Sequence, residues 1–492
     1  MKPNILCIMT DQMRFDAIAE LGNPDIYTPN LDRLVRRGAV MSRAYSNCPV
    51  CVPARYAIRT GSSPLRSGSF QNEPAIGKGL MEERCGEFLA KAMRRRGYRT
   101  FGIGKFHAMS PDTDIGYDVR LHCEDLEWPG DDYVNAMRRH PEYGDVEQYH
   151  GERTEMYYQP QLSPVPAKLK SESWVTDRSL EQMSADDDRP WFGFVSFLGP
   201  HPPFAPPEPY NRMYDPDRMR DPVAGPDDID FMDERVRWNR YFVFAEEMSN
   251  AHFRTLRARY YGTISYIDSC IGRLLDAVDD DTFICFTADH GEFLGDHQAI
   301  QKENFFEESV HVPMLISWPG QIDAGSSCDA VTMLSDLFGL FTSAAGDLEL
   351  RDGADLFGVL QGRAEPRETA FAYSSAPGTL DFRAMALRGP WKYIFHANGG
   401  GELLFNLDED PREHVNRIKD SSALSDELRT TLIAEMKRFP AGLPGLENGT
   451  LKTFPRTPLK MERVYQFRHY CGIGKDGFPA KPEAVFQTLE DC

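Results

Sequence analysis

Three features are scarce in this sequence, and each scarcity excludes a class of protein. No apolar run among the 492 residues approaches the ~20 residues that a bilayer-spanning helix needs, so a membrane protein is not expected. Basic residues are outnumbered, 55 Lys and Arg against 75 Asp and Glu, and the net charge of −20 argues against a nucleic-acid or anionic-membrane partner. The ten cysteines are scattered, and several, such as Cys7 and Cys285, lie in apolar contexts, which argues against a secreted disulfide framework.

The first residues predict a core strand rather than a targeting signal. Met1–Pro3 run directly into the apolar stretch Asn4–Met9, without the regions that make up a secretory signal peptide. We therefore expect a cytoplasmic protein.

Strand-like and helix-like segments alternate from residue 1 to about 375. The expected strands are short apolar runs: Asn4–Thr10, Tyr98–Gly102, Trp191–Phe197, Thr282–Thr287 and Pro313–Trp318. The expected helices between them include Thr28–Gly38, Cys85–Arg96 and Arg254–Val278. This alternation predicts an α/β fold with a large, mostly parallel central sheet flanked by helices, in which ligands collect at the carboxyl ends of the strands.

The pattern changes near residue 376. Short antiparallel strands and one helix are expected there, at Phe382–Leu387, Lys392–Phe395, Glu402–Leu407 and Ser425–Arg438. We therefore predict two domains: a catalytic α/β domain over residues 1–375 and a smaller C-terminal α+β domain over residues 376–492, which ends in an extended tail.

Two long segments interrupt the alternation, residues 109–170 and residues 201–250. Both are rich in proline, tyrosine, aspartate and arginine and have weak periodicity. Long irregular loops in a compact enzyme often form the walls of the active site. The alternative is that they are surface insertions without a role in the chemistry.

Polar residues follow two of the expected strands directly. Asp11 and Gln12 follow the first strand, and Asp289 and His290 follow the strand at Thr282–Phe286. A single aspartate in such a place is usually a cap or turn residue. Carboxylates and an imidazole gathered at one edge of a sheet, however, are a plausible site for a divalent cation.

Four further motifs carry reactive or cationic side chains, which an anion-binding pocket needs in so acidic a chain. They are Cys51-Val52-Pro53-Ala54-Arg55 followed by Thr60-Gly61, then Gly104-Lys105-Phe106-His107, then Phe197-Leu198-Gly199-Pro200-His201-Pro202-Pro203, and Lys302 followed by Asn304–Ser309. Each motif alone has an ordinary explanation as a turn or loop. Together, and in this order along the chain, they resemble the formylglycine-dependent sulfatases of the alkaline phosphatase superfamily, over the range from Asn4 to about Asn416.

The resemblance implies the roles of the site residues. Cys51 would be oxidised to formylglycine by a maturation enzyme, and it would hold a divalent cation, Ca²⁺ or alternatively Mn²⁺, together with Asp11, Gln12, Asp289 and His290. The other roles would be as follows: Arg55 holds the aldehyde hydrate, Lys105 contacts sulfate and hydrate, His107 takes a proton, His201 binds sulfate or assists the leaving group, Lys302 lies nearest the leaving oxygen, and Asn72 touches the anion.

The expected reaction follows from the chemistry of an aldehyde hydrate. One of its two hydroxyls attacks sulfur and forms a covalent sulfo-enzyme intermediate, and deprotonation of the other expels sulfate. The expected function is therefore that of an arylsulfatase-like sulfuric ester hydrolase acting on small anionic esters. The sequence does not identify the alcohol that is released.

This sequence departs from the family pattern at four of these positions. Gln12 replaces a second aspartate, and His290 replaces an asparagine, which makes the site less purely suited to calcium. Ala54 replaces the usual serine, and Arg59 stands where a leucine is usual. The Cys-x-Pro-x-Arg core is intact, so we expect the modification to occur.

Three alternatives remain open at this point. Phosphonate monoester and phosphodiester hydrolases use the same nucleophile, and Ala54, Gln12, Asn72 and the Asp-His pair resemble that branch. Cys48 and Cys51 form a Cys-x-x-Cys, which could be a redox pair or half a zinc site. A chain whose Cys51 is never oxidised could be a binding protein. Large cytosolic enzymes are often homo-oligomers, which the sequence neither requires nor excludes.

Overall fold

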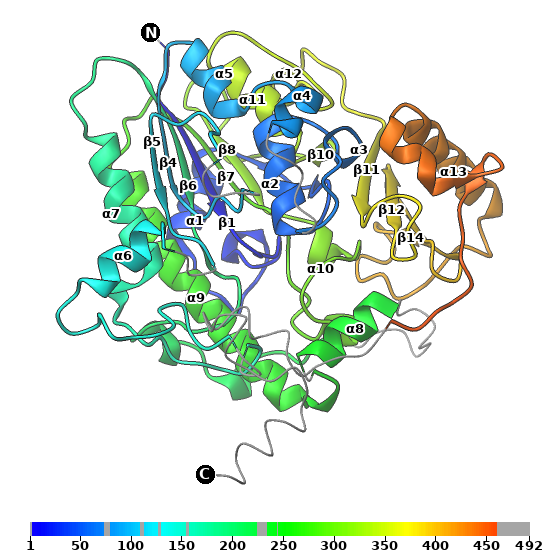
Figure 1. Ribbon diagram of the computed structural model, residues 1–492, viewed down its shortest axis with the longest axis horizontal. Helices are drawn as coiled ribbons and strands as arrows, with labels where there is room; N and C mark the ends of the chain where they lie inside the picture. The colour runs from blue at the N-terminus through cyan, green and yellow to red at the C-terminus, as the bar shows by residue number, and fades with distance from the viewer. Residues whose placement is uncertain are drawn as a thin grey trace.

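The computed structural model describes residues 2–72, 79–108, 113–125, 129–153, 157–223, 234–243 and 245–459. Its centre is an eight-stranded sheet with the strand order β5-β4-β6-β1-β7-β8-β2-β9, and a four-stranded sheet lies beside it (Figure 1). The mostly parallel α/β fold with a smaller antiparallel region toward the C-terminus, as predicted from the sequence, is confirmed.

The central sheet is parallel over its first five strands. Strands β5, β4, β6, β1 and β7 all run in one direction, whereas β8 is antiparallel to both β7 and β2. The strands are β1 Ile5–Thr10, β2 Ala39–Met41, β4 Arg99–Gly104, β5 Val119–His122, β6 Trp191–Ser196, β7 Phe283–Ala288, β8 Met314–Ser317 and β9 Ser326–Cys328. Every residue of β1, β4, β6 and β7 is buried. Burial on both faces explains why β1, β6 and β7 are nearly continuous apolar runs.

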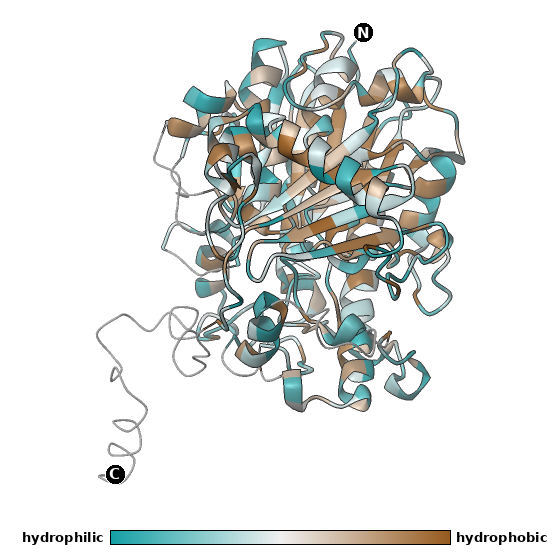
Figure 2. Cartoon of the chain, turned by 90° about the vertical axis from the view of Figure 1, so that its right-hand side faces the viewer, coloured by the Kyte–Doolittle hydropathy of each residue, from teal (hydrophilic) through white to brown (hydrophobic). Residues whose placement is uncertain are grey.

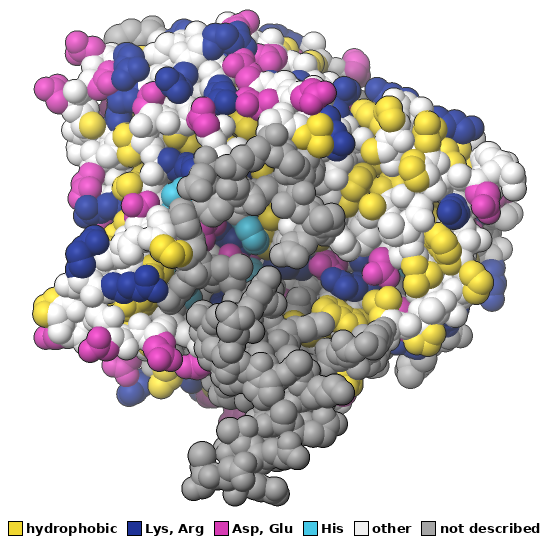
Figure 3. Space-filling view, in the orientation of Figure 1, with side chains coloured by type: hydrophobic (Ala, Val, Ile, Leu, Met, Phe, Trp, Pro, Cys, Tyr) yellow, Lys and Arg dark blue, Asp and Glu magenta, His cyan; other side chains and the backbone are white. Residues whose placement is uncertain are grey.

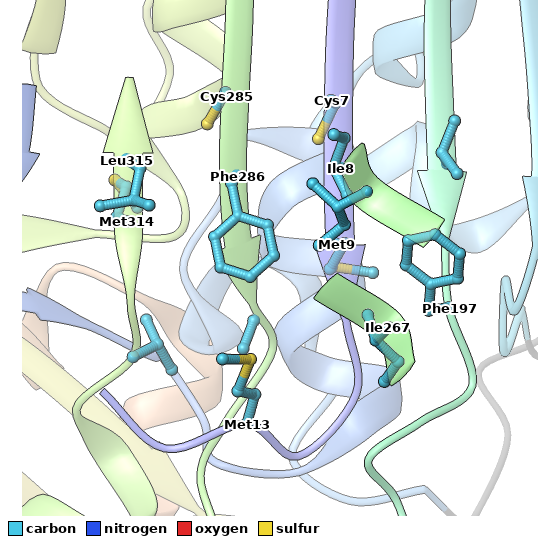
Figure 4. Packing of buried hydrophobic residues seen from close by; sticks show 14 of the residues in the cluster. Cys7, Ile8, Met9, Met13, Phe197, Ile267, Cys285, Phe286, Met314 and Leu315 are labelled. Atoms are coloured by element: carbon cyan, nitrogen blue, oxygen red, sulfur yellow. The ribbon is translucent and has the colours of Figure 1, made fainter. Parts of the chain in front are cut away.

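Helices cover both faces of the sheet. One group contains α1 Pro29–Arg37, α7 Ser171–Met183 and α9 Asn250–Asp276, with α7 on the left in Figure 1. The other group contains α2 Cys51–Thr60, α5 Leu89–Arg95 and α11 Asp336–Ala344. Figure 4 shows Ile267 of α9 beside Met9 of β1 and Phe197. Apolar residues are concentrated on the strands inside the molecule (Figure 2).

The second sheet consists of the antiparallel strands β11 Thr369–Ser374, β12 Arg383–Arg388, β13 Trp391–His396 and β14 Gly401–Asn406. One of its faces packs through Met385 and Ile394 against Phe305 and Phe306. The other face is covered by helix α13 Ser422–Lys437. Because β11 pairs with β12, this sheet begins at Thr369, ahead of the change of pattern expected at residue 376.

Several local predictions differ from the structure. The helix expected at Cys85–Arg96 begins later, as α5 at Leu89, because Cys85 is the last residue of a separate helix, α4 Leu80–Cys85, which Gly86 ends with a φ of 81°. The irregular segments contain β5 and α6 Asp132–Arg138 in residues 109–170, and α8 Glu234–Phe242 in residues 201–250. The expected tail holds a 3₁₀ helix, Pro440–Gly445, and the pair β15 Leu446–Glu447 and β16 Thr450–Leu451, and its residues from 460 on lie outside the described ones. Among the described residues, no helix has the length and apolar character needed to cross a membrane.

Candidate active site

The predicted site residues gather where the parallel strands end. Asp11 follows β1, Asp289 follows β7, Lys105 follows β4, and His201 lies a few residues after β6. The carboxyl ends of parallel strands meet at one edge of a sheet, so these segments, far apart in sequence, share one place. Cys51 is brought there as the first residue of helix α2. Figure 3 shows histidine side chains in a hollow near the middle of the face seen in Figure 1.

Four buried side chains form a cluster whose ligand atoms all lie within 4.8 Å of one another: Asp11, Cys51, Asp289 and His290, here called the active-site cluster. The Sγ atom of Cys51 lies 3.2 Å from His290 Nε2 and 3.8 Å from Asp11 Oδ1. His290 Nε2 lies 3.6 Å from Asp289 Oδ1. Two carboxylates, an imidazole and the group at position 51 make a donor set that fits a divalent cation.

The charge within the cluster also favours a cation. Burial and the nearby Asp11 raise the pKa of Asp289. Burial acts the same way on Asp11, but Lys105, His201 and Arg55 outweigh it and lower the pKa of Asp11 well below its usual value. Two carboxylates forced together therefore differ in how easily they ionise, and a bound cation would favour the ionised form of both.

Gln12, the fifth predicted ligand, lies beside the cluster. Its Oε1 atom accepts a hydrogen bond from Lys302 Nζ at 2.8 Å, and its Nε2 atom donates to Tyr158 at 3.3 Å and to Glu292. Its backbone N–H donates to Asp289 Oδ1 at 3.0 Å. The oxygen that was predicted to bind the cation thus faces the ammonium group of Lys302 in this structure.

Cys51 has an electrostatic environment that favours an anion. Burial and Asp11 would raise the pKa of its thiol, but Lys302, Lys105 and His290 lower it well below the usual value. Lys302 Nζ is 3.1 Å from Sγ. Such a setting stabilises negative charge on whichever group occupies position 51.

Asn72 caps the helix that carries Cys51. The N-cap residue Val50 provides no side-chain cap, and instead Asn72 Oδ1 accepts a hydrogen bond from the backbone N–H of Val52 at 3.0 Å. This satisfies one of the unpaired N–H groups in the first turn of α2. The atom expected to touch the substrate anion therefore has a backbone partner here.

Arg55 bridges the two carboxylates. Its Nη2 atom lies 2.9 Å from Asp11 Oδ2 and its Nε atom 2.9 Å from Asp289 Oδ2. Lys105 Nζ forms ion pairs with Asp11 Oδ2 at 2.8 Å and with Asp125 Oδ2 at 3.2 Å. These charge-assisted contacts fix the orientation of both carboxylates and turn their Oδ1 atoms toward Cys51 and His290.

The two histidines with predicted catalytic roles, His107 and His201, differ in their partners. His201 Nδ1 lies 2.7 Å from the carbonyl oxygen of Pro202, and its Nε2 lies 3.4 Å from the hydroxyl of Tyr157. Burial, Lys105 and Lys302 lower the pKa of His201 to about 4, so it is neutral near pH 7. His107 is half-buried, and its Nδ1 atom has no hydrogen-bond partner among the described residues.

The irregular segment 109–170 contributes residues that the sequence pattern did not single out. Asp125 pairs with Lys105, Arg153 lies 3.5 Å from His201 Nδ1, and Tyr158 donates to Glu292 Oε2 at 2.5 Å. This segment therefore forms part of the wall of the site, as one of the two sequence hypotheses proposed. No periodicity marks these residues, so a charged or aromatic residue there resembles any surface residue.

A comparison with known families identifies the chain at this point. The sequence model of the family named Sulfatase matches residues 3–346. The chain belongs to the sulfatase family. It is 29% identical over 471 residues to a choline-sulfatase of Rhizobium meliloti (strain 1021), covering 89% of this chain and 86% of the relative. It is 27% identical over 493 residues to an arylsulfatase of Clostridium perfringens (strain 13 / Type A), covering 94% and 99%.

The fold comparison agrees with this assignment. The crystal structure of a phosphonate monoester hydrolase of Agrobacterium radiobacter superposes with a TM-score of 0.75 at 25% identity, covering 89% of this chain and 96% of that one. The fold is thus that of the alkaline phosphatase superfamily. The prediction of a sulfuric ester hydrolase is confirmed: this sulfatase is a hydrolase of sulfate esters.

Proposed function

We propose that this sulfatase cleaves sulfate esters with a formylglycine at position 51 and one divalent cation in the active-site cluster. The observation that supports this most is the position of Cys51. Its side chain is buried among Asp11, Asp289 and His290 and lies 3.1 Å from Lys302 Nζ. An ordinary thiol needs no such set of ligands around it, whereas a nucleophile on a cation does.

Each group supplies a distinct part of the chemistry. A hydrated aldehyde provides two hydroxyls on one carbon, the first for attack on sulfur and the second for release of sulfate after deprotonation. A cation held by Asp11, Asp289 and His290 would polarise a sulfuryl oxygen and favour an ionised nucleophile. We propose Ca²⁺ because two of the donors are carboxylates, and Mn²⁺ as the alternative because one donor is an imidazole nitrogen. Gln12 would be a further ligand if its oxygen turned away from Lys302.

The cationic side chains bind the anion and stabilise developing charge. Lys105 neutralises sulfuryl oxygens, and Arg55 holds Asp11 and Asp289 in place for the cation. Asn72, through its contact with the first turn of α2, holds the start of the helix that carries position 51. His107 Nδ1, which has no partner within the described part of the chain, accepts the proton whose loss releases sulfate.

The tautomer of His201 decides which group supports the leaving oxygen. Its Nδ1 atom faces a carbonyl oxygen at 2.7 Å, so this nitrogen carries the proton of the neutral ring. Its Nε2 atom then accepts hydrogen bonds and cannot donate one to the leaving group. The ammonium group of Lys302, 3.1 Å from Cys51 Sγ, therefore supplies that support, and His201 orients the site through Tyr157.

The proposal also covers the cellular location, the maturation enzyme, the partners and the domains of this sulfatase. All eight cysteines in the described part of the chain are free, which fits a cytoplasmic enzyme matured there by a formylglycine-generating enzyme. The substrates are small anionic esters, with no nucleic-acid or membrane partner, and a homo-oligomer is compatible with such an enzyme. We retain two proposed domains, but place their boundary before Thr369 rather than after residue 375, because β11 pairs with β12.

A second activity is favoured by one observation. The phosphonate monoester hydrolase of Agrobacterium radiobacter superposes over 89% of this chain. Phosphonate monoesters and phosphodiesters carry a single negative charge, as sulfate monoesters do, so the same cationic site can accept them. Hydrolysis of phosphonate esters with the same nucleophile is therefore the alternative to the sulfatase reaction.

The test compares aryl sulfate and aryl phosphonate esters as substrates for the purified enzyme and two variants. We expect kcat/KM to be higher for the sulfate ester, and Cys51→Ala to abolish turnover of both. Cys48→Ala is the matched control, since Cys48 is equally buried and lies three residues away. Near-normal turnover by Cys51→Ala would overturn the proposal, and loss of turnover by both variants would favour a Cys48–Cys51 redox pair.

A further inference from the structure

The loop after β4 carries two of the proposed catalytic groups, Lys105 and His107, and its backbone is held at consecutive peptide groups. The N–H of Lys105 donates to the carbonyl oxygen of Ser196 at 2.9 Å. The carbonyl oxygen of Lys105 accepts from Arg55 Nη1 at 2.6 Å, and the carbonyl oxygen of the next residue, Phe106, accepts from Arg59 Nη2. Two arginines one turn apart on α2 thus hold two successive carbonyl groups.

A carboxylate holds the amide side of the same loop. Glu124 Oε1 accepts from the N–H of Phe106 at 3.1 Å, and Glu124 Oε2 accepts from the N–H of His107 at 3.0 Å. Burial would raise the pKa of Glu124, but His122 and His107 lower it, so the carboxylate is ionised. Both hydrogen bonds are therefore charge-assisted and stronger than those to a neutral acceptor.

Arg59 is costly to bury, and most of its hydrogen-bond donors are unsatisfied within the described part of the chain. It is 2% exposed, and its Nε and Nη1 atoms have no hydrogen-bond partner among the described residues. The Cζ atom of its guanidinium group lies 5.7 Å from the ring centroid of Phe106 and 5.9 Å from that of Phe194. An apolar residue of similar volume would fill this space without the cost of an incompletely satisfied charge.

The conformation that these contacts hold is a strained one. His107 has a φ of 47°, in the left-handed region, where a residue other than glycine persists only if its surroundings enforce it. The same loop directs Lys105 Nζ to within 2.8 Å of Asp11. If the backbone of the loop relaxed, both the ammonium group and the imidazole would move away from the active-site cluster.

We propose that Arg59 and Glu124 are positioning residues, which clamp the backbone of Lys105–His107 in the conformation required for catalysis. This inference rests on the proposed function, because it gives the clamp a purpose through the roles of Lys105 and His107. It predicts that Arg59 improves activity at the expense of stability. An arginine at this position holds the carbonyl group of Phe106, which a leucine cannot do.

The test uses three variants, Arg59→Leu, Arg59→Lys and Glu124→Gln, and two matched controls. Arg99→Leu removes another buried arginine that donates to a backbone carbonyl, at the opposite end of β4. Asp268→Asn changes another buried carboxylate that accepts two successive backbone N–H groups, those of Asn30 and Leu31. Three quantities are measured: kcat and KM with the better ester, thermal unfolding, and hydrogen exchange of the peptide covering residues 104–108.

We expect Arg59→Leu to lower kcat by about 10- to 100-fold, the cost of displacing catalytic groups by about 1 Å. Its unfolding temperature stays the same or rises, because an apolar side chain replaces a buried charge. Arg59→Lys, which can still donate to Phe106, retains more activity than Arg59→Leu although it is less stable. Exchange in residues 104–108 accelerates in Arg59→Leu and Glu124→Gln, and neither control changes it or kcat.

Hydrogen exchange separates this proposal from the proposed function. The clamp proposal would be overturned if hydrogen exchange in residues 104–108 of Arg59→Leu were unchanged, or if the kcat of this variant equalled that of the wild type. If the matured wild type hydrolysed neither ester, the proposed function would fail by itself, while faster exchange in Arg59→Leu but not in Arg99→Leu would still support the clamp. Equal activity of the Leu and Lys variants, or greater activity of the Leu variant, would show that Arg59 has only a structural role.

Discussion

Two clusters of buried charges in this sulfatase are built from the same kinds of residues but differ in what satisfies them. In the cluster beside the four-stranded sheet, Lys392, Glu307, Glu413 and His311, here called the sheet cluster, the protein supplies its own cation. Lys392 Nζ donates to the carbonyl oxygen of Phe305 and contacts Glu307 Oε1 and Glu413 Oε1, each at 2.7 Å. His311 Nδ1 lies 2.8 Å from the remaining oxygen of Glu307.

The active-site cluster is left open by comparison. Arg55 occupies Oδ2 of both Asp11 and Asp289, but their Oδ1 atoms turn toward His290 Nε2, at 3.9 and 3.6 Å. Lys105 Nζ lies 2.8 Å from Asp11 Oδ2 and Lys302 Nζ lies 3.1 Å from Cys51 Sγ, whereas Lys392 alone contacts both carboxylates of the sheet cluster. The comparison teaches that the carboxylates of the sheet cluster are neutralised by one lysine and stabilise the fold, whereas the active-site cluster holds four ligand atoms within 4.8 Å of one another and is suited to an external cation.

The largest effect is expected from removing a ligand of the active-site cluster. Asp289→Asn should lower kcat by about 10³-fold, because a cation in the site contributes several kcal/mol of transition-state stabilisation. The fold should persist, since the change is isosteric. Steady-state kinetics together with circular dichroism measure both effects. A variant that retains more than a tenth of the wild-type kcat would show that Asp289 is not a ligand.

Removing the lysine of the sheet cluster should lower stability rather than activity. Lys392→Met leaves Glu307 and Glu413 without their cation in a buried place, and should lower the free energy of unfolding by about 3–5 kcal/mol with little change in kcat. Urea denaturation measures the loss. Arg388→Met on the neighbouring strand is the control, since its pair with the exposed Glu427 should contribute little to stability. A large fall in kcat of folded Lys392→Met would contradict the assignment of this cluster to stability.

The stability of the fold should depend on pH through His201. The pKa of His201 in the fold is lowered to about 4 by burial, Lys105 and Lys302, against about 6.5 in an unfolded chain. Between pH 4 and pH 6.5 the unfolded chain binds a proton at this histidine that the folded protein does not bind. The free energy of unfolding therefore falls by up to about 3 kcal/mol as the pH drops from 6.5 to 4. Urea denaturation of His201→Asn at pH 5 and pH 7 should show a smaller pH dependence than the wild type. The control is His414→Asn, which changes an exposed histidine, and an unchanged slope in His201→Asn would refute the prediction.

The smallest expected effect is that of the cation itself. Adding Ca²⁺ or Mn²⁺ to the chelator-treated enzyme at about 100 times its Kd should raise the free energy of unfolding by about 2.7 kcal/mol. Asp11→Asn should lose most of this gain. Asp336→Asn, which alters a buried carboxylate paired with Arg367, should keep it. Equal gains in all three proteins would place cation binding outside the active-site cluster.

The sequence predicted those parts of the site that follow buried strands. Asp11 and Asp289 could be found because each comes directly after an apolar run whose place in a parallel sheet fixes where its end lies. The strands β1, β6 and β7 were predictable for the same reason. Short strands such as β2 and β9, of three residues each, carry too little periodicity to be recognised.

Other contacts depend on distances that no local pattern encodes. Arg59 was visible as a departure from the family pattern, but its contact with Phe106 requires the packing of α2 on the sheet. Arg153 and Asp125 lie in irregular segments, where a charged residue carries no periodic signal. The hydrogen bond of Lys302 to Gln12 joins residues that are 290 positions apart, so the sequence indicated both residues without indicating that they meet.

The most direct test of the account is the chemical state of position 51. The tryptic peptide Ala44–Arg55, alkylated without reduction, contains both Cys48 and Cys51, so its mass distinguishes the possible states. We predict one alkylated cysteine and an aldehyde at position 51 in enzyme that releases sulfate. Two alkylated cysteines in a preparation that turns over sulfate esters would contradict the formylglycine mechanism, and a disulfide between them would favour redox chemistry instead.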